Sequence, residues 1–202
     1  MGRTPKYSVD EILDAAGRLL AEDGPAALTI TRIAASLGAP SGSIYHRFRS
    51  RDVLVATLWM RTVEEFQRAV GPALTELDPH DAARTAARRI MGWARTHPDG
   101  ARVLLLYRSR DLLDGEWPPD LVDRNLEQRA RIETMLGDLC VRLGATRVAQ
   151  KQRVAFAVIE IPSAAARSTI SRGQVPSRAL DAIVDDAVTA VLLPLATDRG
   201  PT

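Results

Sequence analysis

Cysteine and aromatic residues are scarce in this chain of 202 residues. The single cysteine, Cys140, excludes an intramolecular disulfide framework and a cysteine-rich zinc site. Aromatic residues make up only 4% of the chain, so alanine, leucine, valine and isoleucine must fill most of the core. Because 46% of the residues are hydrophobic and strand-type runs are few, we expect a packed, all-α protein.

Long apolar segments and the usual catalytic motifs are missing as well. No stretch approaches the roughly 18–20 apolar residues that cross a membrane, and the start of the chain lacks the apolar core of a signal peptide. We therefore expect a cytoplasmic protein without membrane contact. The sequence has no GxSxG, no glycine-rich phosphate loop and no supported Cys/His pair, so we predict no enzyme. His80 and His97 stand beside prolines without a third ligand, so we predict no metal and no cofactor.

The net charge of +2 is small, but its distribution is uneven. Residues 1–51 carry seven Lys/Arg and five Asp/Glu, which leaves 20 of each sign for residues 52–202. Between Gly24 and Arg51 there are four arginines and no acidic residue. A local positive surface on a neutral body is what binding to phosphate requires.

Caps, glycines and prolines divide the chain into nine predicted helices. Ser8 and Glu11 form a capping box, and Gly24-Pro25 ends the first helix. Pro162 should bend the eighth helix. The predicted ranges are about 9–22, 30–37, 41–47, 51–70, 81–96, 99–113, 119–143, 146–171 and 177–195.

The second and third helices have the spacing of a helix-turn-helix. Ala34 is small where two helices must approach, Gly38 follows four positions later in the turn, and Ile44 lies six positions beyond that. Helix 41–47 would then be the recognition helix. A helical hairpin that contacts no nucleic acid remains the alternative.

The segment Thr29–Arg51 resembles the tetracycline-repressor (TetR) family of bacterial transcription regulators. The matching elements, in order and spacing, are Thr29, Ile33-Ala34, Leu37-Gly38, Ser43-Ile44-Tyr45, Phe48, Ser50 and Leu54. The resemblance implies an all-α dimer with a helix-turn-helix DNA-binding domain at 1–51. Residues 52–202 would form a helical ligand-binding and dimerisation domain.

The resemblance also assigns roles in binding a double-stranded DNA operator. Phosphate contacts are expected from Thr29, Ser43, Tyr45 and Arg51, and base contacts from Thr31, Ser41, Gly42 and His46, with Arg47 reaching either. Gly42 permits close approach to DNA but cannot read a base by hydrogen bonding. Arg3, Lys6 and Tyr7 form either a frayed terminus or a basic arm on phosphate.

The last two predicted helices, 146–171 and 177–195, are the expected homodimer interface. Residues 180–195 repeat apolar side chains at helical spacing over four turns, and residues 163–166 are small enough for close helix packing. Packing of these helices within one chain is the alternative. The resemblance favours a four-helix interface between two subunits.

An unknown small-molecule effector is expected in a pocket among the helices of the second domain. Its predicted walls are Trp59, Phe66, Trp93, Tyr107, Trp117, Met135, Cys140, Phe156 and Glu160. Most of these side chains could equally be plain core. Glu160 lies in an otherwise apolar run, where it would need a partner such as Arg167 or would recognise a ligand.

A ligand-responsive repressor is the function that these patterns favour. The DNA-binding domains of two subunits would bind successive major grooves of a palindromic operator. An effector would release the protein from the operator by binding the DNA-free conformation more tightly. The alternative is a helical module that regulates by protein contact.

Overall fold

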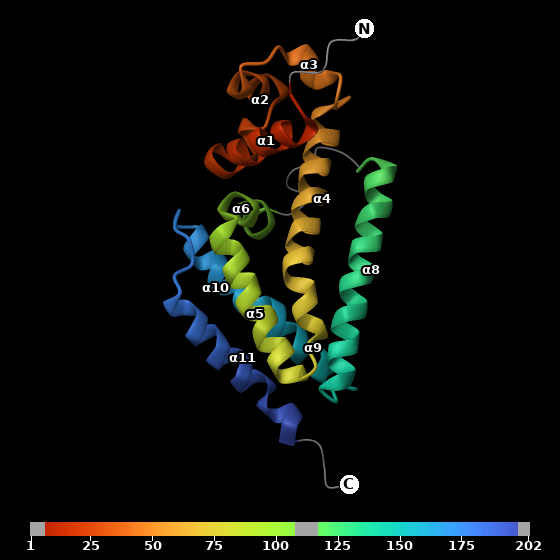
Figure 1. The fold of residues 1–202 in the computed structure, drawn as a ribbon, viewed down its shortest axis with the longest axis vertical. Helices are drawn as coiled ribbons and strands as arrows, with labels where there is room; N and C mark the ends of the chain where they lie inside the picture. Colours follow the sequence, from red (N-terminus) through yellow and green to blue (C-terminus); the bar gives the residue numbers. More distant parts are fainter. Residues whose placement is uncertain (1–6, 108–116, 198–202) are drawn as a thin grey trace.

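The computed structural model describes residues 7–107 and 117–197, and these residues form helices and loops without a strand. The prediction of an all-α fold is confirmed. The molecule is elongated: α1–α3 form a head at one end, and the long helix α4 leads from this head into a helical body (Figure 1). No helix among the described residues is long and apolar enough to span a membrane.

The head begins with α1 (Val9–Asp23), whose capping box is formed as predicted. Ser8 N donates to Glu11 Oε2 at 2.7 Å, and Glu11 N donates to Ser8 Oγ at 3.1 Å. Hydrogen bonding from the backbone amide of Ser8, with a smaller contribution from its side chain, lowers the pKa of Glu11. The carboxylate therefore supports the helix at neutral pH, and that support is lost as the pH falls through its lowered pKa.

The turns of the head depend on two glycines with positive φ. Gly24 ends α1 at φ 77° and ψ −177°, a positive-φ conformation outside the left-handed helical region. Gly38 adopts the left-handed helical conformation, with φ 61° and ψ 34°, after α2 (Ile30–Leu37). Between them lies a short 3-10 turn, η1 (Pro25–Ala27). The recognition helix α3 (Ser41–Tyr45) ends earlier than predicted, because the chain turns at His46.

The body contains the remaining helices. They are α4 (Arg51–Val70), the 3-10 turn η2 (Gly71–Thr75), α5 (Pro79–Thr96), α6 (Pro98–Leu106), α8 (Pro119–Arg142), α9 (Val148–Ala155), the π-helical turn η3 (Phe156–Glu160), α10 (Ile161–Ile170) and α11 (Ala179–Thr197). The helix expected at 99–113 ends at Leu106, and its predicted end lies outside the described residues. The other boundaries lie close to the predicted ones, because prolines and capping residues set them.

Pro162 does more than bend its helix. The predicted helix 146–171 is divided into α9, η3 and α10. Proline has no N–H to donate to Val158, and its ring would clash with that carbonyl group in a straight α-helix. The π-helical turn immediately before Pro162 accommodates this and changes which residues face the core.

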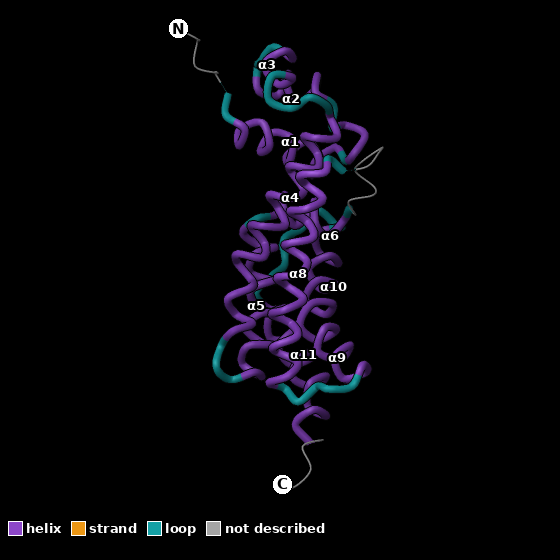
Figure 2. Tube along the Cα trace, turned by 90° about the vertical axis from the view of Figure 1, so that its right-hand side faces the viewer, coloured by secondary structure: helices purple, strands orange, loops and turns teal. Residues whose placement is uncertain are grey.

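Two apolar cores share α4. In the head core, Ile12, Ile33 and Ile44 are almost completely buried together with Leu54 and Leu58 of α4. The C-terminal end of α4 contributes to the body core, which α5 and α8–α11 complete. The side view shows the same arrangement, with the head stacked on the body along α4 (Figure 2). A division of the chain at residue 51 remains a prediction, because the head core extends into α4.

The close contact between α2 and α3 gives the first testable prediction. Ala34 is 2% exposed and belongs to the head core, whereas Ala35 beside it is exposed. Ala34→Leu should lower the free energy of unfolding by about 1–3 kcal/mol, because the larger side chain overpacks the contact. Urea denaturation measures this, and Ala35→Leu is the matched control. Equal stability of the two variants would show that this contact is not tight.

Candidate nucleic-acid interface

Packing of the head decides which side chains of the helix-turn-helix face outward. Ile30, Ile33 and Ala34 of α2 are buried, as are Ile44 and Phe48 in and after α3. Tyr7 adds a contact that sequence reasoning missed: its hydroxyl donates to the carbonyl oxygen of Leu37 at 2.7 Å. This bond ties the segment before α1 to the end of α2. The sequence gives no local signal for it, because thirty positions separate the two residues.

The nine residues predicted to contact DNA lie along α2, α3 and the start of α4. Exposed among them are Thr29, Thr31, Gly42, Tyr45, His46 and Arg47, while Ser41, Ser43 and Arg51 are partly buried. Thr29 is the N-cap of α2, because its Oγ1 accepts from Arg32 N at 3.2 Å. Tyr45 is 57% exposed, so its ring is not packed in the head core. The α2–α3 end of the head therefore presents hydroxyl, imidazole and guanidinium groups to solvent.

Ser43 and Arg51, two of the partly buried residues predicted to contact DNA, form hydrogen bonds within the fold. The Oγ of Ser43 donates to the carbonyl oxygen of Pro40 at 2.6 Å, which supports the first turn of α3. Arg51 Nε donates to the carbonyl oxygen of Leu28 at 2.8 Å, and its Nη1 forms an ion pair with Asp52 at 3.1 Å. Arg51 thus fastens the loop before α2 to the start of α4. Its role as a phosphate contact stays a prediction.

The N-terminal arm is described only at its end. Arg3 and Lys6 lie outside the described residues. The carbonyl oxygen of Tyr7 accepts from Arg47 Nη2 at 3.4 Å, so this backbone lies beside the end of the recognition helix.

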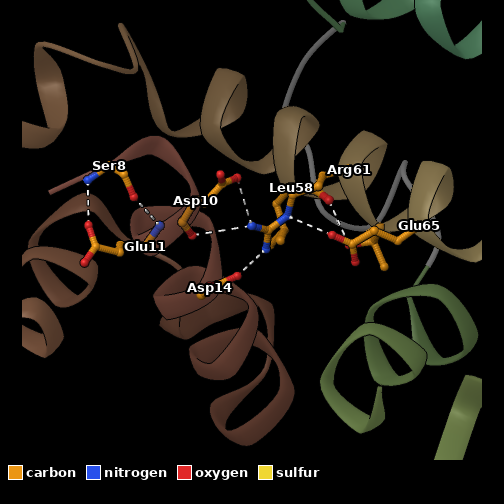
Figure 3. A network of polar contacts seen from close by, with 8 residues as sticks. Ser8, Asp10, Glu11, Asp14, Leu58, Arg61 and Glu65 are labelled. Atoms are coloured by element: carbon orange, nitrogen blue, oxygen red, sulfur yellow. Dashed lines mark hydrogen bonds and ion pairs between the residues drawn. The ribbon is translucent and has the colours of Figure 1, made fainter. Parts of the chain in front are cut away.

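Arg61 links the head to the body. It projects from α4 toward α1, where its Nη2 forms an ion pair with Asp14 at 2.7 Å and its Nη1 approaches Asp10 Oδ1 at 3.5 Å (Figure 3). On the other side, Nε faces Glu65 at 3.7 Å. The side chain of Arg61 is 23% exposed, so solvent screens these ion pairs only in part. Sequence reasoning missed this residue because its partners on α1 lie 47 and 51 positions away.

The predicted effector-binding residues do not line one pocket. Trp59 and Tyr107 pack on the head core, and Trp117 packs in a small cluster with Met60 and Leu121. Phe66 and Trp93 meet edge to face in the body, with ring centroids 5.1 Å apart. His97 stacks on Trp93 at 5.4 Å, which explains this histidine as a structural residue. Burial raises the pKa of the Cys140 thiol, so Cys140 behaves as core.

The expectation of a buried Glu160 was wrong. Both Glu160 and Phe156 are exposed, and Phe156 has 53% of its surface accessible. Arg167, the proposed partner of Glu160, instead donates from Nε to the carbonyl oxygen of Leu105 at 2.9 Å. The π-helical turn shifts the register of this segment, so a face predicted from a straight helix is misplaced.

A cleft of about 590 Å³ opens between α4, η2 and α8, which is a size that suits a small molecule. Of the nine predicted walls, it includes Met135 alone. The lining residues are Glu64, Gln67, Arg68, Gly71, Pro72, Thr75, Gln128, Arg131, Ile132 and Met135. In the part of the chain that the structure describes, no group of three or more His, Cys, Asp or Glu side chains could hold a metal ion.

The fold and the outward side chains of α2 and α3 define a helix-turn-helix protein of the all-α class. Residues 12–58 match the model of bacterial regulatory proteins of the tetR family. This part of the chain, from α1 into the first turns of α4, is therefore similar to the tetR family.

Curated relatives come from mycobacteria. HTH-type transcriptional regulator Rv1816 of Mycobacterium tuberculosis is 32% identical over 102 residues, which cover 49% of this chain and 43% of the relative. HTH-type transcriptional regulator Mb1846 of Mycobacterium bovis matches to the same extent. The aligned region thus spans less than half the length of these relatives.

Solved structures resemble the chain over nearly its whole length. A TetR-like transcriptional regulator from Rhodococcus sp. RHA1 has a TM-score of 0.69 at 21% identity, covering 96% of this chain and 99% of the other. The transcriptional regulator FadR from Bacillus subtilis, solved in complex with stearoyl-CoA, has a TM-score of 0.68 at 14% identity, covering 92% and 98%. At these identities the likeness establishes the fold.

The Arg61 contacts lead to the second prediction. Arg61→Gln should lower the free energy of unfolding by about 1 kcal/mol, because three carboxylates lose their shared cation. Hydrogen exchange should also become faster in α1, since the head loses its polar contact with the body. Arg68→Gln is the control on the same helix, because Arg68 is exposed and carries no hydrogen bond or ion pair with the described residues. Identical exchange in both variants would contradict a linking role for Arg61.

Proposed function

We propose that the protein is a homodimeric, sequence-specific DNA-binding transcriptional regulator, released from a palindromic operator by a small molecule. The observation that carries the proposal is the exposed polar surface of α2 and α3 above a rigid apolar core. A recognition helix held in this way can enter a major groove without reorganising. The segment from Gly24 to Arg51 carries no acidic residue that would oppose phosphate.

The small size of the outward side chains bears on specificity. Ser41 and Gly42, at the start of α3, would go deepest into the groove, yet neither makes the bidentate contacts that discriminate bases most strongly. We therefore assign much of the specificity to His46, to Arg47 and to the shape of the DNA. Tyr45 and Thr29 are assigned to phosphate, and a role of Arg51 in binding phosphate would compete with its bonds to the loop before α2.

The arrangement of α11 supports dimerisation through the last helices. One face of α11 packs into the body core through Val184, Val188 and Leu192. The opposite face leaves large apolar side chains uncovered, with Ile183 62% and Leu193 60% exposed. On the adjacent segment, Phe156 and Ala164 are exposed as well. Two copies of this surface would bury each other across a twofold axis and form a four-helix interface.

Release by an effector would act through α4, which belongs to both cores. A ligand that favours a different packing of the body would tilt α4 and carry the head with it through the Arg61 contacts. The FadR structural neighbour was solved with stearoyl-CoA, which supports a small-molecule site in this fold. The ligand must bind the released state more tightly than the DNA-bound state.

Selection of bound sequences from random DNA tests the proposal directly. We expect a palindrome, because two equivalent heads impose their twofold symmetry on the operator. Binding should weaken steeply as salt rises. Absence of binding to any DNA at low salt would overturn the proposal in favour of a helical module that contacts proteins.

Tyr45 provides the third prediction. Tyr45→Ala should weaken binding roughly three- to tenfold on all DNA sequences alike, because a phosphate hydrogen bond carries no base information. Fluorescence anisotropy on the selected operator and on unrelated DNA measures the ratio. Arg129→Gln, an exposed change on α8 away from the head, is the control. If Tyr45→Ala binds as tightly as the control, Tyr45 is not a phosphate contact.

The exposed face of α11 provides the fourth prediction. Ile183→Glu should convert the dimer to a monomer in analytical ultracentrifugation, because two carboxylates would be buried near the twofold axis. Operator affinity should fall at least tenfold with loss of the second head. Val141→Glu changes a comparably exposed valine on α8 and should leave the dimer intact. If Ile183→Glu still forms dimers at the concentration at which the parent protein does, the interface lies elsewhere.

A further inference from the structure

The cleft between α4, η2 and α8 continues into a second, more apolar one. The second cleft has a volume of about 470 Å³ and lies between η2, the residues after it and the end of α8. Thr75 and Met135 line both clefts, so the two form one groove. Between Gln128 and Arg142, the first and last lining residues on α8, the helix rises about 21 Å. The groove is therefore elongated.

One end of the groove is positively charged. Arg68 on α4 and Arg131 on α8 both line the first cleft, and neither makes a hydrogen bond or ion pair with any residue that the structure describes. The acidic residue in this cleft, Glu64, is neutralised by Arg124, whose Nη2 lies 2.6 Å from Glu64 Oε1. Two guanidinium groups without a charge partner among the described residues thus line the same cleft.

The other end of the groove is apolar and uncovered. Leu77 is 98% and Val141 is 72% exposed, although both are large hydrophobic residues. Arg142, which also lines this end, is held by the carbonyl oxygens of Glu76 and Leu74. Asp138 is the acidic residue at this end, and it would repel an anion placed there. A ligand with a single negative charge at one end therefore has one favourable orientation.

We propose that this groove binds a single-chain amphipathic anion, with its carboxylate or phosphate group between Arg68 and Arg131 and its alkyl chain directed along η2 toward Leu77 and Val141. Burial of the chain against Met135 and Ile132 supplies affinity, and the two arginines supply selectivity for the anion. The identification of this ligand as the effector rests on the proposed function, whereas binding itself does not. Because Arg68 lies on α4, the occupied groove acts on the helix that carries the head.

Calorimetry on the full chain tests the ligand class. The probes are dodecanoate, dodecyl phosphate, dodecanol and dodecyltrimethylammonium, each below the concentration at which it forms micelles. We expect at least one anion to bind roughly tenfold or more tightly than the alcohol and the cation. Preference for dodecanoate identifies a fatty-acid carboxylate as the head group, and preference for dodecyl phosphate identifies a phosphate-bearing acyl compound. Equal binding of all four probes, or binding of none, overturns the proposal.

Substitutions at exposed positions test the orientation without threatening the fold. Arg68→Gln and Arg131→Gln should each weaken binding of the preferred anion roughly tenfold, whereas Arg129→Gln should leave it unchanged. Leu77→Ser and Val141→Ser should weaken the binding of dodecanoate or dodecyl phosphate. They should not weaken the binding of the octyl compound with the same head group, because its shorter chain does not reach these residues. Unchanged affinity in both arginine variants, or in both apolar variants, contradicts the assigned orientation. If the anion binds selectively but does not change the affinity for the operator, the groove binds the anion as proposed, but the anion is not the effector.

Discussion

Burial of α4 in two cores is the constraint on which the structure depends. Its first turns complete the head core through Leu54 and Leu58, and its last turn enters the body core through Val70. Apolar contacts of this kind resist separation because exposing them to water costs about 25 cal/mol per Å². The head therefore cannot rotate freely on the body, and a change in the tilt of α4 displaces both ends.

Polar contacts restrict the relative orientation of the head and α4 in addition to this apolar packing. Arg61 fixes the rotation of α1 against α4 through Asp10 and Asp14, which a hydrophobic contact alone would specify less strictly (Figure 3). Arg68 lies about two turns further along the same helix, at the charged end of the groove. The proposed effector site and the head–body contact are thus parts of one helix, and a ligand would not need a long pathway to influence the head.

The three surfaces with proposed roles lie on different parts of the molecule. The outward face of α2 and α3 is polar and basic, the outward face of α11 is apolar, and the groove beside α8 combines charge with apolar surface. Each surface has a chemistry that its proposed partner complements: phosphate, a second copy of the chain, and an amphipathic anion. Because no residue of one surface belongs to another, the three proposed partners would not compete for the same residues, and the proposed effector would act without occupying the DNA-binding face.

The sequence by itself determined most of the helices, the capping box of α1, the Gly38 turn and the buried side of the helix-turn-helix, because these depend on neighbours a few positions apart. The tertiary structure alone decided that Arg51 and Arg61 make internal contacts, that Glu160 faces solvent and that the cleft lies beside α8 rather than among the aromatic residues. These outcomes depend on partners more than twenty positions away and on a π-helical turn that changes the register before Pro162. Local patterns carry no information about either, since side chains meet across helices only after the cores have packed.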